Sequence, residues 1–187
     1  MVIYLLTKNK GKIRAANSVF NQYGIEVKNI EKEYPEIQAD SSAEIARYAA
    51  LEAAREFNVP VVREDHSLFI HALGIPGPYT NYIEKHLSTE KLLTLMQNES
   101  DKTGHFELAL AFAEPNGSTQ EFSYTVPIRI KEKIEVEDPR GGWNSILCLE
   151  SETRAFTEYP EEERINVWNK NYIAIAKFLK ERGMSAK

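Results

Sequence analysis

The sequence contains a single cysteine, Cys148, which excludes an internal disulfide and is typical of a reducing compartment. No apolar run approaches the roughly 18 residues of a membrane span, and the apolar stretch 2–6 is too short for the core of a signal peptide. The net charge of −5 provides no field that would hold a polyanion. We therefore expect a cytoplasmic protein without nucleic acid or membrane as main partners, whereas a small phosphorylated ligand needs only a few local donors.

The composition predicts a folded chain. Apolar residues make up 42% and charged residues 27% of the 187 positions, which are ordinary values for a globular protein. A chain of this length buries most of its apolar surface around one core. Because we find no internal repeat, low-complexity tract or linker, we expect residues 1–187 to form a single domain.

In the first half of the chain, strand patterns alternate with helix patterns. We predict strands at residues 2–6, at 25–30 and from 61 onward, and helices from about residue 12 to 23 and at 42–56. Gly24 is placed to cap the first helix, and Ser41 with Glu44 has the spacing of a capping box. The third strand is expected to deliver Glu64 and Asp65 to its C-terminal end, where open α/β sheets tend to bind ligands.

In the second half, the two kinds of element separate. We predict short helices at 80–86 and 88–96, and a long antiparallel hairpin around Asn116-Gly117. Alternating apolar residues suggest that the hairpin reaches Val136 with one face buried. An apolar stripe from Ile165 to Leu179 predicts one closing helix. Together these patterns predict a mixed α/β sheet with a cleft between two lobes.

Two groups of polar residues follow predicted strands. Thr7, Asn9 and Lys12 lie in a loop that leads into a helix N-terminus, where backbone N–H groups and the helix dipole attract phosphate. Glu36 and the pair formed by Glu64 and Asp65 supply the oxygen ligands that Mg²⁺ prefers, and a carboxylate could also orient an attacking water. The alternative for the loop is a capped, solvated turn, and for the acids plain surface exposure.

A third group combines tryptophan with amide side chains. Trp143 precedes Asn144, and Trp168 precedes Asn169 and Lys170. Indoles can stack on a base, and amides can read its polar edge. Trp168 lies on an apolar helix stripe and is equally well explained as a core residue, so Trp143 is the better ligand candidate. We interpret His66, His71 and Cys148 as structural, because they lack the companions of a metal site or a nucleophile.

The motifs taken in order resemble the inosine triphosphate pyrophosphatase family, and the resemblance covers nearly the whole chain. It is carried by residues 7–12 (Thr-Lys-Asn-Lys-Gly-Lys), 35–38 (Pro-Glu-Ile-Gln), 62–65 (Val-Arg-Glu-Asp), 72–79 (Ala-Leu-Gly-Ile-Pro-Gly-Pro-Tyr) and 156–160 (Phe-Thr-Glu-Tyr-Pro). The family fold is an elongated, twisted mixed sheet flanked by helices, with two lobes around a central cleft. Its members hydrolyse non-canonical purine nucleoside triphosphates to monophosphate and pyrophosphate, and they commonly form homodimers.

The resemblance also implies roles for individual residues. Thr7, Asn9 and Lys12 would hold phosphates, with Lys12 taking part in catalysis. Glu36 would bind Mg²⁺, Asp65 would assist the metal or the attacking water, and Glu64 would support it. The implied function is that of a magnesium-dependent nucleoside triphosphate diphosphatase acting on a nucleotide substrate.

The chain departs from the family where the base and some phosphates are read. Ala49 and Asn81 stand at positions of family lysines, and the sequence Gly141-Gly142-Trp143-Asn144-Ser145 replaces a motif with a stacking phenylalanine and an acid. Arg164 replaces a lysine, and residues 168–170 (Trp-Asn-Lys) replace Ser-His-Arg. Our hypothesis is that Trp168 supplies the lost stacking while Asn144 and Asn169 read a different edge. The alternative function is a nucleotide-binding homologue with weakened catalysis.

Overall fold

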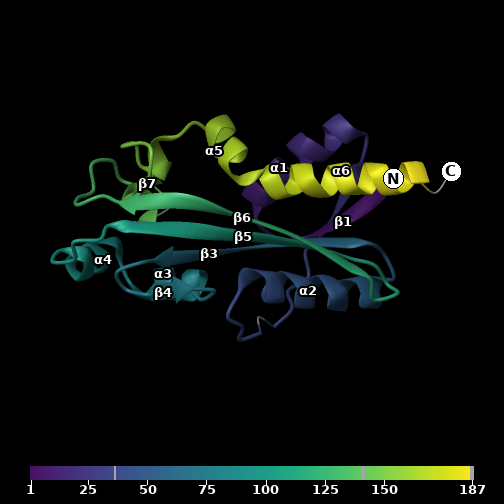
Figure 1. The fold of residues 1–187 in the computed structure, drawn as a ribbon, viewed down its shortest axis with the longest axis horizontal. Coiled ribbons are helices and arrows are strands. Elements are labelled where there is room, and N and C mark those ends of the chain that lie inside the picture. The colour runs from purple at the N-terminus through teal and green to yellow at the C-terminus, as the bar shows by residue number, and fades with distance from the viewer. Residues whose placement is uncertain (36, 140–141, 186–187) are drawn as a thin grey trace. The chain divides into compact units, whose positions relative to one another are not determined.

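The computed structural model describes residues 1–35, 37–139 and 142–185, and Figure 1 shows its ribbon. The chain divides into two compact units: unit 1 is Met1–Asp65, Leu108–Tyr124 and Ile165–Lys187, and unit 2 is His66–Glu107 and Thr125–Arg164. The strands are β1 (Val2–Leu6), β2 (Glu26–Ile30), β3 (Val61–Ile70), β4 (Ile75–Gly77), β5 (Thr103–Ala113), β6 (Thr119–Ile130) and β7 (Leu147–Leu149). The α-helices are α1 (Lys10–Phe20), α2 (Ser42–Phe57), α3 (Thr80–His86), α4 (Thr89–Met96), α5 (Glu161–Trp168) and α6 (Lys170–Ser185).

The strands form one mixed sheet in the order β2-β1-β3-β5-β6-β7, with β4 paired to β3. β1 is parallel to both β2 and β3, as expected for strands joined through helices. β4 is antiparallel to β3, and β7 is antiparallel to β6. The predicted hairpin is present, since β5 and β6 are neighbours and Gly117 turns the chain with a φ of 91°. The predicted mixed α/β fold is therefore confirmed.

In unit 1 the sheet is covered on both faces, by α1 and α6 on one and by α2 on the other (Figure 1). Leu110 and Phe112 of β5 pack with α1 and α6, whereas Ala111 and Ala113 pack with α2. This follows from the alternation of side chains along a strand. The prediction of a hairpin buried on one face is therefore wrong for this part of β5, because helices cover both sides.

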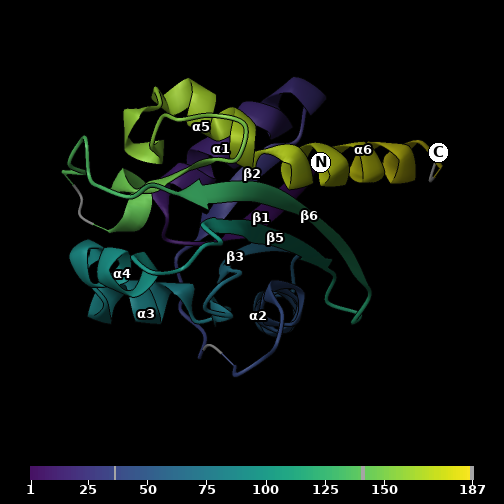
Figure 2. The ribbon, with the colours of Figure 1, turned by 60° about the vertical axis from the view of Figure 1, so that its left-hand side comes forward.

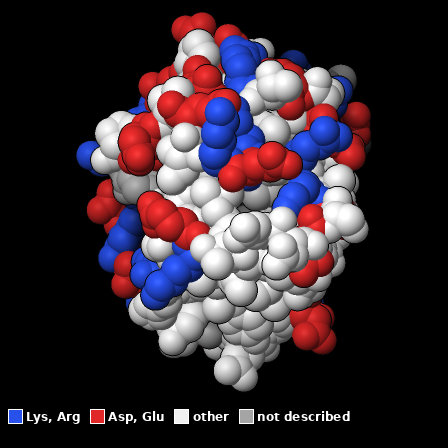
Figure 3. Space-filling view, turned by 90° about the vertical axis from the view of Figure 1, so that its left-hand side faces the viewer, with Lys and Arg blue, Asp and Glu red and all other residues white. Residues whose placement is uncertain are grey.

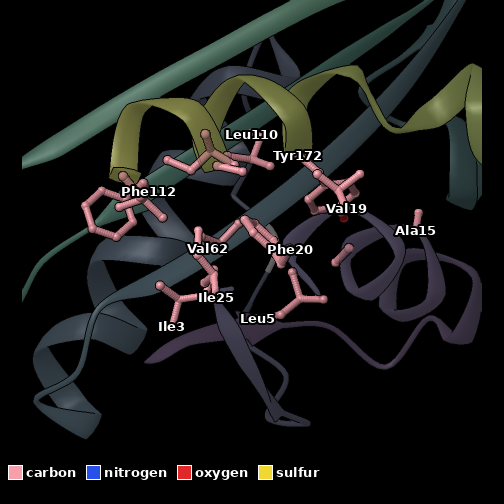
Figure 4. Packing of buried hydrophobic residues seen from close by; sticks show 14 residues of the cluster. Ile3, Leu5, Ala15, Val19, Phe20, Ile25, Val62, Leu110, Phe112 and Tyr172 are labelled. Atoms are coloured by element: carbon pink, nitrogen blue, oxygen red, sulfur yellow. The ribbon is translucent and has the colours of Figure 1, made fainter. Parts of the chain in front are cut away.

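The core beneath α6 is built around two aromatic rings. Phe20 of α1 and Tyr172 of α6 are both 0% exposed, and their rings meet edge to face with centroids 5.9 Å apart. Figure 4 shows both side chains within the same apolar cluster. Burying a large aromatic side chain stabilises a fold by about 3 kcal/mol or more relative to alanine. This packing fixes the first turn of α6, and with it the hydroxyl of Tyr172, inside unit 1.

Side chains cap the N-termini of α1 and α2 in unit 1, and of these two caps the sequence predicts the one at Ser41. The Asn9 Oδ1 accepts hydrogen bonds from the backbone N–H groups of Gly11 and Lys12 at the start of α1. Ser41 accepts from the backbone N–H of Glu44 at the start of α2. The two caps satisfy N–H groups that have no partner within the helix. They also fix where each helix begins, and in α1 this sets the position of Lys12.

Unit 2 contains two short helices, α3 and α4, which lie side by side in both views (Figures 1 and 2). Thr80 anchors α3, because its Oγ1 accepts from the backbone N–H of Leu68 and donates to the carbonyl of Gly77. Ser88 caps α4 by accepting from the backbone N–H of Lys91. Across the residues that the structure describes, no helix is both long and apolar enough to cross a membrane.

Three element boundaries differ from the sequence prediction. β3 continues to Ile70 because its second half pairs with β4, so Glu64 and Asp65 lie inside the strand and not at its end. β6 ends at Ile130, and the predicted strand up to Val136 is wrong because that segment has no strand partner in the described chain. The closing helix is interrupted at Asn169, between α5 and α6.

Candidate active site

The loop between β1 and α1 is folded by its own polar side chains. Thr7 is 5% exposed, and its Oγ1 accepts from the backbone N–H of Asn9 at 3.1 Å. The Asn9 Oδ1 is itself occupied, at 2.8 Å from the nitrogen of Gly11 and 3.3 Å from that of Lys12. Thr7 and Asn9 thus shape the loop. Asn9 in particular caps the N-terminus of α1 and so fixes where this helix begins.

Lys12 joins this loop to β3. Its Nζ donates to the backbone carbonyl oxygen of Glu64 at 2.8 Å, across 52 residues of sequence. The structure therefore brings together the two groups that the sequence analysis found separately, the loop and the acids of β3. An ammonium group has three donors, of which this hydrogen bond to a carbonyl uses one.

Glu64 and Asp65 are neighbours in sequence but have different surroundings. Val62 packs with α1 and α6, whereas Val61 packs with α2. Because side chains alternate along a strand, Glu64 shares the face of Val62 and Asp65 that of Val61. The sequence analysis treated Glu64 and Asp65 as one adjacent pair. This is corrected here, because in a regular strand their side chains lie on opposite faces.

Glu64 is enclosed by tyrosines. It is 2% exposed, and its Oε2 accepts a hydrogen bond of 2.9 Å from the hydroxyl of Tyr172. Burial first, and then the Glu64 carboxylate, raise the pKa of Tyr172 well above its ordinary value, so the phenol stays protonated as the donor. Burial and then Glu64 likewise raise the pKa of Tyr124. Glu64 is thus held from the α6 side through its Oε2.

Asp65 has an oxygen atom that the described protein does not satisfy. Its side chain is half-buried, and its Oδ2 is buried without a hydrogen-bond partner among the described residues. A buried polar atom of this kind is uncommon in native proteins and is costly to maintain. A carboxylate oxygen accepts hydrogen bonds or binds a cation, so the Asp65 environment fits a divalent ion or a bound water.

Three of the predicted base-reading residues lie at the junction of α5 and α6: Trp168 ends α5, Asn169 separates the helices and Lys170 begins α6. Trp168 and Asn169 are half-buried and Lys170 is exposed, with the Lys170 Nζ lying 5.3 Å from the centre of the Tyr124 ring. The Tyr124 hydroxyl donates to the carbonyl of Val167 at 2.9 Å. Asn171 donates to the carbonyl of Leu108 at 3.0 Å, which ties the start of α6 to β5. These bonds hold residues 168–170 in a defined corner of unit 1.

Trp143 belongs to the interior of unit 2. Its side chain is 1% exposed, its indole N–H donates to the carbonyl of Leu87 at 3.0 Å, and its backbone N–H donates to Oε1 of Glu84 at 2.8 Å. In this conformation neither face of the indole is open to a base. The indole of Trp143 is therefore not available here for the stacking that the sequence analysis suggested.

The remaining predicted residues divide by location. Asn144 and Arg164 are half-buried in unit 2. Glu36 and Gly141 lie outside the described residues, so the predicted convergence of Glu36 and Asp65 stays a prediction. Tyr172 and Glu84 are residues that the sequence analysis missed. The sequence marks Tyr172 only as part of the apolar stripe of its helix, and it gives no sign of a role for Glu84. The hydrogen-bond partners of both residues are distant in sequence.

The carboxylate of Glu84 leaves no room for a side chain at Gly142, and a substitution there tests this packing. Gly142 has a φ of 87°, and a Cβ atom there would lie 2.6 Å from Oε1 of Glu84. We expect Gly142→Ala to lower the free energy of unfolding by about 1–3 kcal/mol, because it adds backbone strain and displaces the carboxylate from Trp143. Thermal denaturation measures the loss. In the Glu84→Ala background part of the clash is absent, so Gly142→Ala should cost less there; equal costs in both backgrounds would contradict this account.

The described surface also contains a cavity and a mixed-charge face. A cavity of about 750 Å³ in unit 2 is lined by Lys102, Arg129, Lys131, Cys148 and Glu152 among others, and none of the predicted site residues is among its lining residues. Burial raises the pKa of the Cys148 thiol, as expected for an unreactive cysteine. Figure 3 shows basic and acidic side chains interspersed over one part of a face, beside a broad uncharged area. The charges drawn there do not gather into a patch of one sign.

The sequence and the fold both match known proteins. The model of the Ham1 family matches residues 3–181. A dITP/XTP pyrophosphatase of Methanopyrus kandleri is 34% identical, with 93% of this chain and 99% of the relative covered. One from Ignicoccus hospitalis is 36% identical, covering 95% and 96%. The Ham1 protein structures from Staphylococcus aureus and Coxiella burnetii superpose with TM-scores of 0.80 and 0.82 at 23% and 20% identity, over 97% of this chain and 100% and 99% of theirs.

Proposed function

The chain belongs to the Ham1 family, and from this membership we propose that it is a nucleoside triphosphate pyrophosphohydrolase acting on a non-canonical purine nucleotide. Relatives that match it over nearly their whole length are named dITP/XTP pyrophosphatases. The reaction cleaves the α–β phosphoanhydride and yields a nucleoside monophosphate and pyrophosphate. The observation that most supports this for the chain itself is the Lys12 contact with β3, beside the unsatisfied oxygen of Asp65.

The loop at residues 7–12 has the properties of a phosphate-binding element. The N-terminus of α1 carries the partial positive charge of its helix dipole, and the Lys12 ammonium lies in its first turn. In the proposed complex, Lys12 neutralises negative charge on the phosphates. Thr7 and Asn9 keep the loop in its shape through their internal hydrogen bonds, and Thr7 is also a proposed phosphate contact.

We propose Mg²⁺ as the cofactor, with Asp65 and Glu36 as its protein ligands. When bound, Mg²⁺ would stabilise the charge that develops on the phosphate oxygens. The buried oxygen of Asp65 supports this assignment, since it has no partner among the described residues. Asp65 is also suited to hold the attacking water and to accept its proton. Glu64 has a supporting role, because its carboxylate is held by Tyr172.

For the base, we propose contacts from the corner at residues 168–170. Trp168 provides a flat surface for stacking, and Asn169 offers both a donor and an acceptor to the polar edge. Asn144 and Arg164 remain predicted contacts on the strength of the family resemblance. The resemblance also underlies our proposal that the protein is a cytoplasmic homodimer, which light scattering during size-exclusion chromatography would test.

The test is release of pyrophosphate from a panel of nucleoside triphosphates with Mg²⁺. We expect hydrolysis with a preference for particular purine bases, and a flatter preference for the Trp168→Ala variant. The second candidate function is nucleotide binding with weak turnover. It is favoured by Ala49, which is 7% exposed among other alanines of α2, so α2 offers no cation there. Thermal stabilisation by nucleotides without pyrophosphate release would support that alternative and contradict our proposal.

A further inference from the structure

Arg63 lies at the start of the phosphate-binding loop. It precedes Glu64 on β3, and its Nη1 donates to the carbonyl oxygen of Leu6 at 3.2 Å. Leu6 is the last residue of β1 and the one before Thr7. The guanidinium is therefore held where the loop leaves the sheet, while Lys12 approaches the next residue of β3 from α1. Two cations thus border the same loop.

One edge of the Arg63 guanidinium has no acceptor among the residues that the structure describes. Within the described part of the chain, the bond to Leu6 is the one hydrogen bond recorded for this group, and the Nε atom is buried without a partner. The Nε and Nη2 atoms form the side of the guanidinium that binds two oxygens of a phosphate or carboxylate at once. A buried donor costs free energy when it is left unsatisfied, so this edge calls for an acceptor that the described protein does not provide.

Nearby cations are less suited to this role. Lys8 is an exposed side chain with its Nζ 3.0 Å from Oε1 of Glu33. No cation is among the buried residues of α2, which are Ser42, Ile45, Ala46, Ala49, Ala50, Ala53 and Ala54. Strand alternation directs Arg63 to the α2 side of the sheet, with Val61. Arg63 is therefore positioned to provide the cation that α2 does not.

Arg63 and Asp65 point to the nature of the ligand. They are two residues apart on β3 and so share a face of the strand. Although they are of opposite charge, no ion pair between them is recorded, and a buried atom of each has no hydrogen-bond partner among the described residues. A ligand that satisfies both must bring an anionic acceptor for Arg63 and a cation or hydrogen-bond donor for Asp65. A phosphate group with its divalent ion brings both.

We propose that Arg63 is a substrate-binding residue that grips a phosphate of the nucleotide with its Nε–Nη2 edge. The identity of this anion as a nucleotide phosphate rests on the proposed function. The chemistry of the contact does not, because the guanidinium would bind any phosphate that enters this part of the loop. Arg63 and Lys12 then act from two sides, with Arg63 fixing the orientation of the phosphate and Lys12 supplying charge.

The test uses inorganic pyrophosphate as the probe, titrated calorimetrically with Mg²⁺ into the full chain. Arg63→Met removes the charge and keeps an unbranched side chain, so we expect binding to weaken by about ten- to a hundredfold. Arg63→Lys keeps the charge and loses the bidentate contact, so its affinity for pyrophosphate should lie between those of the wild type and Arg63→Met. Arg47→Met is the matched control, because this arginine of α2 is half exposed and pairs at the surface with Glu121. It should bind like the wild type.

The outcomes separate this inference from the proposed function. If Arg63→Met and Arg63→Lys are folded, as judged by their melting temperatures, and bind pyrophosphate like the wild type, the inference is wrong. A purely structural arginine would produce that result, with a lower melting temperature only. If Arg63→Met does not fold, Arg63→Lys decides alone. If the wild type binds pyrophosphate through Arg63 but hydrolyses no nucleotide, the inference stands and the proposed function fails.

Discussion

Asp65→Asn is expected to lower kcat by about a thousandfold, within the range of roughly 10²–10⁴ that a positioned acid or base contributes. Asparagine has nearly the same shape, but it cannot accept a proton from water and is a weak ligand for Mg²⁺. The melting temperature should stay the same or rise slightly. The Oδ2 of Asp65 has no partner among the described residues, so the free protein loses no recorded hydrogen bond at this atom.

This separation of activity from stability is the informative part of the result. Steady-state kinetics and thermal denaturation on the same preparations would measure it. Glu150→Gln makes the same charge change at an exposed acid and should leave both quantities unchanged. Glu64→Gln should instead lower stability, since the carboxylate is buried and accepts from Tyr172. Near-normal turnover by Asp65→Asn would remove Asp65 from the mechanism, and a large loss of stability would assign it a structural role.

The sequence predicts the fold well where local pattern and tertiary environment agree. The period of apolar residues and the capping side chains place β1, α1, α2 and α3 within a few residues of their observed bounds. The sequence predicts strands less well where pairing with another strand decides their length. β3 is extended by its partner β4, and the alternating apolar residues beyond Ile130 do not form a strand because no neighbouring strand pairs with them in the described chain. Strand pairing joins distant segments, so it is not encoded in the local period.

The candidate site was predictable to a similar degree. A loop between a strand and a helix gives a local signal, and from it the sequence predicts Lys12 as a candidate. The different surroundings of Glu64 and Asp65 follow from strand alternation, but only once both are known to lie inside β3 and not at its end. Trp143 could not be judged from sequence, because its hydrogen-bond partners Leu87 and Glu84 lie more than fifty residues away. Local patterns indicate which residue types are present, whereas packing decides which of them face a ligand.

Lys12→Met is expected to lower kcat/KM by about a hundredfold, the upper end of what a hydrogen bond to a charged group contributes. The substitution keeps an unbranched side chain, one atom shorter, and removes its charge. It also removes the 2.8 Å bond to the Glu64 carbonyl, so a modest stability loss of about 1 kcal/mol should accompany it. Measuring kcat/KM at several salt concentrations tests the electrostatic origin, because the difference from wild type should shrink as ionic strength rises.

Lys10→Met is the control that makes this interpretation specific. Lys10 begins the same helix and has the same charge, but its side chain is exposed and no contact with β3 is recorded for it. If the general positive potential of the helix start were what matters, the two substitutions would lower kcat/KM alike. Because Lys12 alone of the two is recorded against β3, next to Asp65, we expect Lys10→Met to remain close to wild type. Equal losses would mean that the loop attracts phosphate as a diffuse charge, and the arrangement of Lys12, Glu64 and Asp65 would then have no special role in binding it.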